Sequence, residues 1–178
     1  MPDDGPDAAD AAATPEATPV AGAADLTPVD RFFYALSSAA DHGLLWLALG
    51  ALRGAAEGDP MMVVRLGAVL GAESVLTNGV VKTFFRRVRP QEHFVHDAPL
   101  PYGLHRPVTS SFPSGHAASA FTAAGALARG RSAPVWYVLA GLVAYSRVHV
   151  KMHHPADVVG GTVLGLVLGR LARRIVRP

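Results

Sequence analysis

The sequence predicts an all-α, membrane-embedded helical bundle of about five transmembrane helices. Half of its 178 residues are hydrophobic and only 17% are charged, against about 25% in an ordinary soluble domain. Five segments rich in Ala, Val, Leu and Gly approach the length of a spanning helix, which needs about 20 residues. A chain of this size has too little interior to bury five such segments in water. The segments cover residues 42–55, 61–84, 113–128, 134–150 and 156–176.

The N-terminal residues 1–27 have a different composition from the rest of the chain. They contain six acidic residues and no Lys or Arg, and they carry too little apolar surface to offset the entropy of an ordered chain. They also lack the positive leader and the apolar stretch of a signal peptide. We expect a disordered acidic tail at 1–27 and a single membrane domain at 28–178.

The remaining chain is basic, because it carries all 16 Lys and Arg residues. These residues are not interleaved with aromatic side chains and form no helix-turn-helix or ribonucleoprotein motif, so we expect no nucleic-acid partner. The chain has no cysteine, which excludes thiol nucleophiles and zinc ribbons. Any metal site would have to use His and carboxylate ligands.

The first two segments are less regular than simple spanning helices. The first could begin earlier than residue 42, near Asp30. The second is interrupted by Arg65 and Glu73, and an ionised carboxylate is costly inside a membrane. Because Glu73 belongs to no motif, we expect it to be hydrogen-bonded in the interior of the bundle.

Proline marks three helix ends. Pro90 closes the second segment, Pro113 opens the third and Pro155 opens the fifth. Proline fits the first turn of a helix and ends a helix that it follows. If the segments cross the membrane alternately, these three corners lie at one membrane face.

The fifth segment also carries a pattern typical of close helix packing. Gly161, Gly165 and Gly169 recur four residues apart, so they lie on one helix face and allow a neighbouring backbone to approach.

Arginine residues predict the orientation of the bundle. The face opposite the corners is expected to be cytoplasmic by the positive-inside rule, so the corners should face the extracytoplasmic side. The arginines assigned to the cytoplasmic face are Arg53, Arg129, Arg131, Arg173, Arg174 and Arg177. The rule alone does not decide this, because the corners are basic too and their cations need another explanation.

The first corner contributes Lys82 and Arg89. Seven residues are two helical turns, so on a continuous helix both side chains would lie on nearly the same face. Arg86 falls near that face and Arg87 does not. We interpret Arg86 and Arg87 as interfacial cations attracted to anionic lipid.

The second corner has the features of an anion-binding helix start. Ser114 offers a hydroxyl, Gly115 allows close approach, and the first backbone N–H groups of the helix are free. His116 follows within the first turn.

The third corner brings together Arg147, His153 and Asp157. If Pro155 is the first helical residue, His154 caps the helix and Asp157 reaches back over the preceding chain. Asp157 can then contact the ring of His153, which fixes the position of the ring proton and stabilises the charged ring.

A metal site at this corner is the alternative, with His149, His153 and Asp157 as ligands. No second His-rich segment completes a ligand set, and the nearby Arg147 and Lys151 disfavour a cation. We therefore expect no metal. Three further histidines, His93, His96 and His105, fall in a polar loop and are interpreted as solvated.

The three corners together supply the groups that phosphoryl transfer requires. The cations and the helix start stabilise the charge on the phosphoryl oxygens. His153 can act as the in-line nucleophile and His116 as the acid for the leaving oxygen.

These residues resemble the three-part signature of the type 2 phosphatidic acid phosphatase superfamily, which also includes class A acid phosphatases and vanadium haloperoxidases. Its parts are Lys-x6-Arg-Pro, Pro-Ser-Gly-His and Ser-Arg-x5-His-x3-Asp, and here they lie at residues 82–90, 113–116 and 146–157. The resemblance implies an all-α core, a metal-independent mechanism without cofactor and a phosphohistidine intermediate.

Carried over residue by residue, the resemblance makes His153 the nucleophile, Asp157 its orienting partner and His116 the proton donor. The residues that it implies as phosphate ligands are Lys82, Arg89, Ser114, Gly115 and Arg147. Membrane members of this size dephosphorylate lipid phosphates or polyprenyl pyrophosphates at the outer membrane face.

We therefore expect a multi-pass bacterial inner-membrane phosphatase acting on a phosphatidyl or polyprenyl phosphate. The abundance of Ala and Arg suggests a GC-rich bacterial genome, in which family members act on decaprenyl-linked phosphoribose. Two alternatives stay open: a non-catalytic lipid-phosphate-binding membrane protein, and a haloperoxidase-like enzyme with vanadate in the phosphate pocket. The sequence leaves open the lipid, the choice between mono- and diphosphate, and the oligomeric state.

Overall fold

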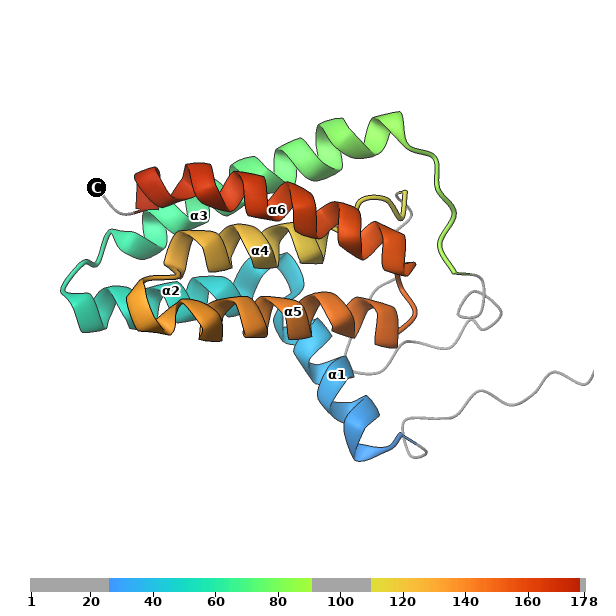
Figure 1. The fold of residues 1–178 in the computed structure, drawn as a ribbon, viewed down its shortest axis with the longest axis horizontal. Coiled ribbons are helices and arrows are strands. Elements are labelled where there is room, and N and C mark those ends of the chain that lie inside the picture. Colours follow the sequence, from blue (N-terminus) through green and yellow to red (C-terminus); the bar gives the residue numbers. More distant parts are fainter. Residues whose placement is uncertain (1–25, 91–109, 177–178) are drawn as a thin grey trace, which may run out of the picture.

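A computed structural model describes residues 26–90 and 110–176 of the chain. These ranges fold into six α-helices with short 3-10 and π turns, and they contain no strand. The expected tail at 1–27 falls almost wholly outside the described residues, as do His93, His96 and His105. The helices are α1 Pro28–Ala39, α2 Leu44–Glu57, α3 Met62–Ser74, α4 Gly115–Leu127, α5 Ala133–His149 and α6 Pro155–Val176 (Figure 1).

The predicted first segment, 42–55, corresponds to α2, and the earlier start considered near Asp30 is a separate helix, α1. Thr27 caps α1 through a capping box with Asp30, which satisfies free N–H groups at the helix start. The pair of helices is bent by 59° at the 3-10 turn Asp41–Gly43, where His42 and Gly43 have positive φ angles of 53° and 75°. Such angles break the helical path.

The helical path of the second segment ends at Phe84, at the bound predicted for it, and does not continue to Pro90. After α3 the helical path continues through a π turn, Val75–Val80, and a 3-10 turn, Val81–Phe84, and it stops at the extended Phe85. Lys82 and Arg89 therefore do not share a helix face, and the predicted reason for their proximity was wrong. β-Branched and aromatic residues weaken the helix here, and Pro90 disfavours helical geometry in the residue before it.

Helix α4 forms the centre of the bundle, and Figure 1 shows it between α5 and α6. Most of its residues are buried and small. A Cβ atom on Gly161 or Gly165 would collide with the backbone carbonyl of Ser114 or Ala118, respectively. The predicted close packing at the glycine stripe is confirmed, with α4 as the partner.

The outer faces of the bundle are apolar. Exposed aliphatic residues run along α5 and α6, a surface that a protein in water rarely presents. Among the described residues, two helical stretches, Met62–Phe84 and Pro155–Val176, are long and apolar enough to cross a membrane, and the bent pair α1–α2 would make a third. Helices α4 and α5, with 13 and 17 residues, are shorter than a typical spanning helix. The exposed aliphatic residues include Val135, Val138, Leu142, Val159, Val163, Val167, Leu171 and Ile175.

The three predicted corners lie at the same end of the bundle. In Figure 1 the helical stretch that starts with α3 ends there, α4 and α6 begin there, and α5 ends there. At the opposite end, Arg53 donates to the carbonyl of Leu127 at 2.6 Å, and Arg173 donates to that of Gly125 at 3.3 Å. These arginines satisfy carbonyls at the C-terminal end of α4, so they stabilise the helix end as well as set the charge of that face.

Candidate active site

A cavity of about 470 Å³ opens at the end of the bundle where the corners meet. Six of the residues predicted for the site line this cavity: Lys82, Arg89, Gly115, His116, Arg147 and His153. The structure thus gathers residues from all three corners around one volume. The other two, Ser114 and Asp157, are fully buried and are not among the residues that line the cavity.

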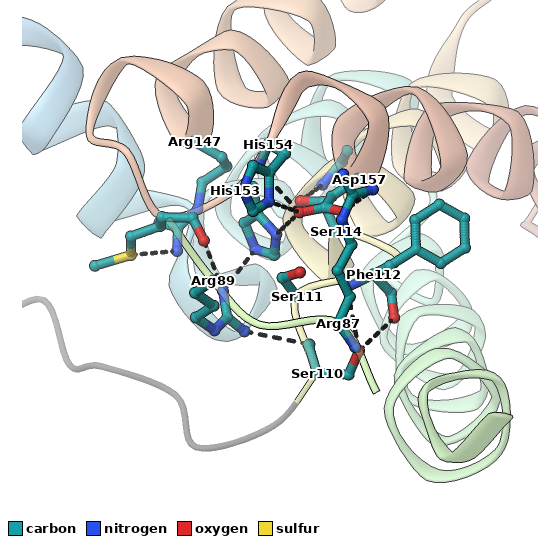
Figure 2. A network of polar contacts seen from close by, with 12 residues as sticks. Arg87, Arg89, Ser110, Ser111, Phe112, Ser114, Arg147, His153, His154 and Asp157 are labelled. Atoms are coloured by element: carbon teal, nitrogen blue, oxygen red, sulfur yellow. Dashed lines mark hydrogen bonds and ion pairs between the residues drawn. The ribbon is translucent and has the colours of Figure 1, made fainter. Parts of the chain in front are cut away.

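His153 lies in the link between α5 and α6 and is almost fully buried. Its Nε2 atom is 3.2 Å from Nη1 of Arg89, and its Nδ1 atom is 3.7 Å from Oδ2 of Asp157 (Figure 2). A guanidinium only donates hydrogen bonds, so Nε2 is the accepting nitrogen and the ring proton belongs on Nδ1, toward Asp157. The unprotonated ring nitrogen is therefore the one beside the cation.

Burial lowers the pKa of His153 to about 4, and the neighbouring cations Arg89 and Arg147 act in the same direction. Hydrogen bonding to Asp157 opposes this shift but does not overcome it. At neutral pH the imidazole is therefore uncharged, which is the state that a nitrogen nucleophile needs.

Asp157 is held by several partners at once. Its Oδ2 atom accepts a hydrogen bond of 2.9 Å from the backbone N–H of His154, which confirms the predicted cap at the start of α6. Its Oδ1 atom is 3.1 Å from Nη1 of Arg87 (Figure 2). The carboxylate is thereby fixed in position beside the ring of His153.

The interpretation of Arg87 as a lipid-facing cation was wrong, because its guanidinium pairs with Asp157. The physical reason is that the helical path stops at Phe84 and the chain becomes extended at Phe85. In an extended chain, alternate side chains point the same way, so Arg87 and Arg89 both reach the third corner. A continuous helix would have placed Arg87 elsewhere, and no pattern in the sequence pointed to this pairing.

Two guanidinium groups are anchored by uncharged partners. Arg89 donates from Nη1 to the carbonyl of Met152 at 2.9 Å, and burial lowers its pKa. Arg147 donates to the hydroxyl of Ser37 and contacts the sulfur of Met152. In the part of the chain that the structure describes, no carboxylate forms an ion pair with Lys82, Arg89 or Arg147. Their charge is available to an anion in the cavity.

The second corner presents the N-terminus of α4 to the same volume. Ser114 caps the helix, with its Oγ atom accepting from the N–H of Ala117 at 3.4 Å, and its own N–H donates to the carbonyl of Asp157 at 2.9 Å. Gly115 lines the cavity, and a Cβ atom there would lie 3.4 Å from the side-chain oxygen of Asn78. The helix start therefore faces the cavity with the geometry of an anion site.

His116 has a partner that the sequence did not indicate. Its Nε2 atom is 2.9 Å from Oδ1 of Asp41, a residue of the turn between α1 and α2 that also lines the cavity. Asp41 precedes His116 by 75 positions and belongs to none of the three motifs, so only the fold reveals the contact.

Glu73 also lines the cavity. It is buried and accepts a hydrogen bond of 2.7 Å from the hydroxyl of Thr77, as expected for an interior carboxyl group. The proposed metal triad is not assembled, because the ring of His149 contacts Asp30 at 2.8 Å. Within residues 26–90 and 110–176, no three His, Asp or Glu side chains are grouped as metal ligands.

Comparison with known proteins places these motifs in a family context. A family model described as the PAP2 superfamily matches residues 62–178. A decaprenylphosphoryl-5-phosphoribose phosphatase of Mycobacterium tuberculosis is 34% identical over 140 residues, which cover 76% of this chain and 74% of the relative. A putative undecaprenyl-diphosphatase of Escherichia coli is 37% identical over 91 residues, covering 47% of this chain and 46% of that protein.

Two solved structures share the fold. The transmembrane PAP2-type phosphatidylglycerolphosphate phosphatase of Bacillus subtilis superposes with a TM-score of 0.63 at 27% identity, covering 84% of this chain and 77% of that chain. LpxE of Aquifex aeolicus gives a TM-score of 0.62 at 29% identity, covering 84% and 88%. The membrane-embedded all-α arrangement predicted from the sequence is thus confirmed.

Proposed function

Because the chain belongs to the PAP2 superfamily, we propose that it is a membrane phosphatase that hydrolyses a lipid-linked phosphate or diphosphate. One observation carries this proposal: three cations, the N-terminus of α4, His116 and His153 line a single cavity. Binding alone requires the cations but neither histidine. Hydrolysis requires, in addition, a nucleophile and a proton donor beside the bound anion.

The geometry supports an in-line displacement through a phosphohistidine. Lys82, Arg89 and Arg147 hold the phosphoryl oxygens, with the N–H groups at the start of α4 beside Gly115. The lone pair on Nε2 of His153 attacks phosphorus, a P–N bond forms, and the P–O bond to the leaving group breaks. His116 gives its proton to the leaving oxygen. Asp157 stabilises the ring of His153 as it becomes positively charged.

The second half of the reaction reverses these roles. His116, now neutral, takes a proton from a water molecule as that water attacks phosphorus. The P–N bond breaks, inorganic phosphate leaves, and His153 returns to its neutral state. This cycle needs no metal, and a cavity lined by three cations repels a divalent cation.

The relatives favour a polyprenyl phosphate as the substrate class. Three of the curated relatives are decaprenylphosphoryl-5-phosphoribose phosphatases, and two are named as undecaprenyl-diphosphatases. A lipid substrate fits a cavity at the end of an apolar bundle, because its chain can stay in the membrane while its phosphate enters the site.

We further place the protein in a bacterial inner membrane with the cavity on the extracytoplasmic side. The support is the arginine-rich end opposite the cavity, which the positive-inside rule assigns to the cytoplasm. The cations at the cavity end are accounted for by the phosphate site and by the pair formed between Arg87 and Asp157.

Metal removal tests the proposed chemistry. We expect purified protein in detergent to release phosphate from farnesyl phosphate, undecaprenyl diphosphate or phosphatidic acid at the same rate with and without EDTA. Vanadate should inhibit, because it occupies a site built for a tetrahedral anion. Loss of activity in EDTA contradicts metal independence. Phosphate binding without turnover would favour the non-catalytic alternative, and halide oxidation with vanadate and peroxide would favour the haloperoxidase-like one.

The pH dependence of kcat/KM tests the state of the nucleophile. Because burial lowers the pKa of His153 to about 4, the ring stays neutral as the pH falls toward 5 and becomes protonated only near pH 4. We expect the acidic limb of the profile to lie near pH 4, about 2.5 units below that of an ordinary histidine. An acidic limb centred between pH 6 and 7 would contradict this. The measurement is initial rates on farnesyl phosphate in buffers of constant ionic strength.

A further inference from the structure

We propose that Asp41 is a positioning residue that holds His116 in place for proton transfer to the leaving group. The inference rests on the proposed function and concerns a residue outside the stretch 62–178 that the family model matches. Its starting point is the contact of 2.9 Å between Oδ1 of Asp41 and Nε2 of His116. A carboxylate offers no proton, so a ring nitrogen paired with it at this distance must carry the proton itself.

The backbone around Asp41 is shaped to make this contact. Asp41 begins the three-residue turn between α1 and α2, and the next residue, His42, has a φ angle of 53°. A non-glycine residue rarely adopts this left-handed conformation, and such strain is often kept at functional sites. The same turn bends the chain by 59° and lines the cavity with Asp41, His42 and Gly43.

The charges around the cavity explain why a carboxylate beside His116 matters. Lys82 and Arg147 line the same volume as His116, and both oppose a positive charge on its ring. A carboxylate in direct contact with the ring offsets part of this opposition and so favours the protonated ring. The contact also assigns the two ring nitrogens, because Nε2 is occupied by Asp41 and Nδ1 is left to transfer the proton.

The arrangement matches that of His153, the cavity histidine proposed as the nucleophile. His153 has Asp157 beside Nδ1 and uses Nε2, whereas His116 has Asp41 beside Nε2 and uses Nδ1. Each histidine thus has its own carboxylate, and each carboxylate fixes which nitrogen reacts. Asp157 acts on the nucleophile, and Asp41 acts on the proton donor.

A comparison of two leaving groups tests this role. Farnesyl phosphate has an alkoxide leaving group that needs a proton, whereas the nitrophenolate of p-nitrophenyl phosphate leaves without one. General acid catalysis contributes about 10²- to 10⁴-fold, so Asp41→Asn should lower kcat/KM for farnesyl phosphate by about 10- to 100-fold. The same variant should change kcat/KM for p-nitrophenyl phosphate by less than about threefold, which also shows that it is folded. Asp41→Glu should recover part of the rate on farnesyl phosphate.

Asp30→Asn is the matched control. Asp30 also joins a histidine to the α1–α2 region, through its contact of 2.8 Å with His149, but it lies outside the cavity lining. If Asp41 only fastened α1 and α2 to the bundle, both variants would lose activity equally on the two substrates. Equal losses, or an unchanged or faster rate of Asp41→Asn on farnesyl phosphate, overturn this inference alone. A wild-type protein inactive on both substrates overturns the proposed function and this inference with it.

Discussion

Replacement of His153 by alanine is expected to lower kcat by roughly 10⁴-fold or more, because removal of a nucleophile eliminates the covalent pathway. Its Nε2 atom lies beside Arg89 in the cavity and its Nδ1 atom faces Asp157. The other cavity histidine that we assign to the reaction, His116, is engaged at Nε2 by Asp41 and cannot take over this role. Phosphate release from farnesyl phosphate in detergent measures the loss.

His149→Ala is the control for this variant. His149 lies four residues earlier, at the end of α5, and its ring contacts Asp30 rather than the cavity. We expect this variant to retain most of the activity. After an alkaline quench, which preserves phosphohistidine, the wild type and His149→Ala should carry labelled phosphate and His153→Ala should not. More than a tenth of wild-type activity in His153→Ala would refute the assignment of the nucleophile.

The convergence of the three corners could be anticipated because it depends on local signals. Proline and glycine mark helix starts, and alternating crossings then place Ser114 and His153 at the same end of the bundle. The glycine stripe of α6 could also be predicted, because its spacing alone defines one helix face. The helix starts and the glycine spacing are properties of single segments, so they are the same in the isolated sequence and in the folded bundle.

The contacts of Arg87 and Asp41 could not be anticipated in this way. Arg87 reaches Asp157 because the helix stops at Phe84 and the chain runs extended to Pro90 (Figure 1). The spacing of residues along a helix does not predict where the side chains of an extended segment point. Asp41 meets His116 through a bend whose left-handed His42 has no sequence signature. Lys82 and Arg89 both line the cavity, but not because they share a helix face. Lys82 lies in the 3-10 turn, and Arg89 lies in the non-helical segment that follows it.

The substitution Gly165→Ala is expected to reduce both stability and activity. A Cβ atom at this position would collide with the carbonyl of Ala118 and lie 2.8 Å from Cβ of Phe121. Neither group can rotate away, so α4 and α6 must separate. Overpacking of this kind costs about 1–3 kcal/mol in the free energy of unfolding, which denaturant unfolding of the protein in mixed micelles measures.

The effect should reach the cavity because α4 and α6 carry different parts of it. The N–H of Ser114 donates to the backbone carbonyl of Asp157 at 2.9 Å, so separation of the helices moves the anion site away from the carboxylate that orients His153. Gly141→Ala on α5 is the matched control, since no atom from outside its own helical turn lies within 4 Å of the added Cβ. There the substitution should only gain helix propensity, up to about 1 kcal/mol. If the two alanine variants prove equally stable and active, close contact between α4 and α6 does not hold the site together.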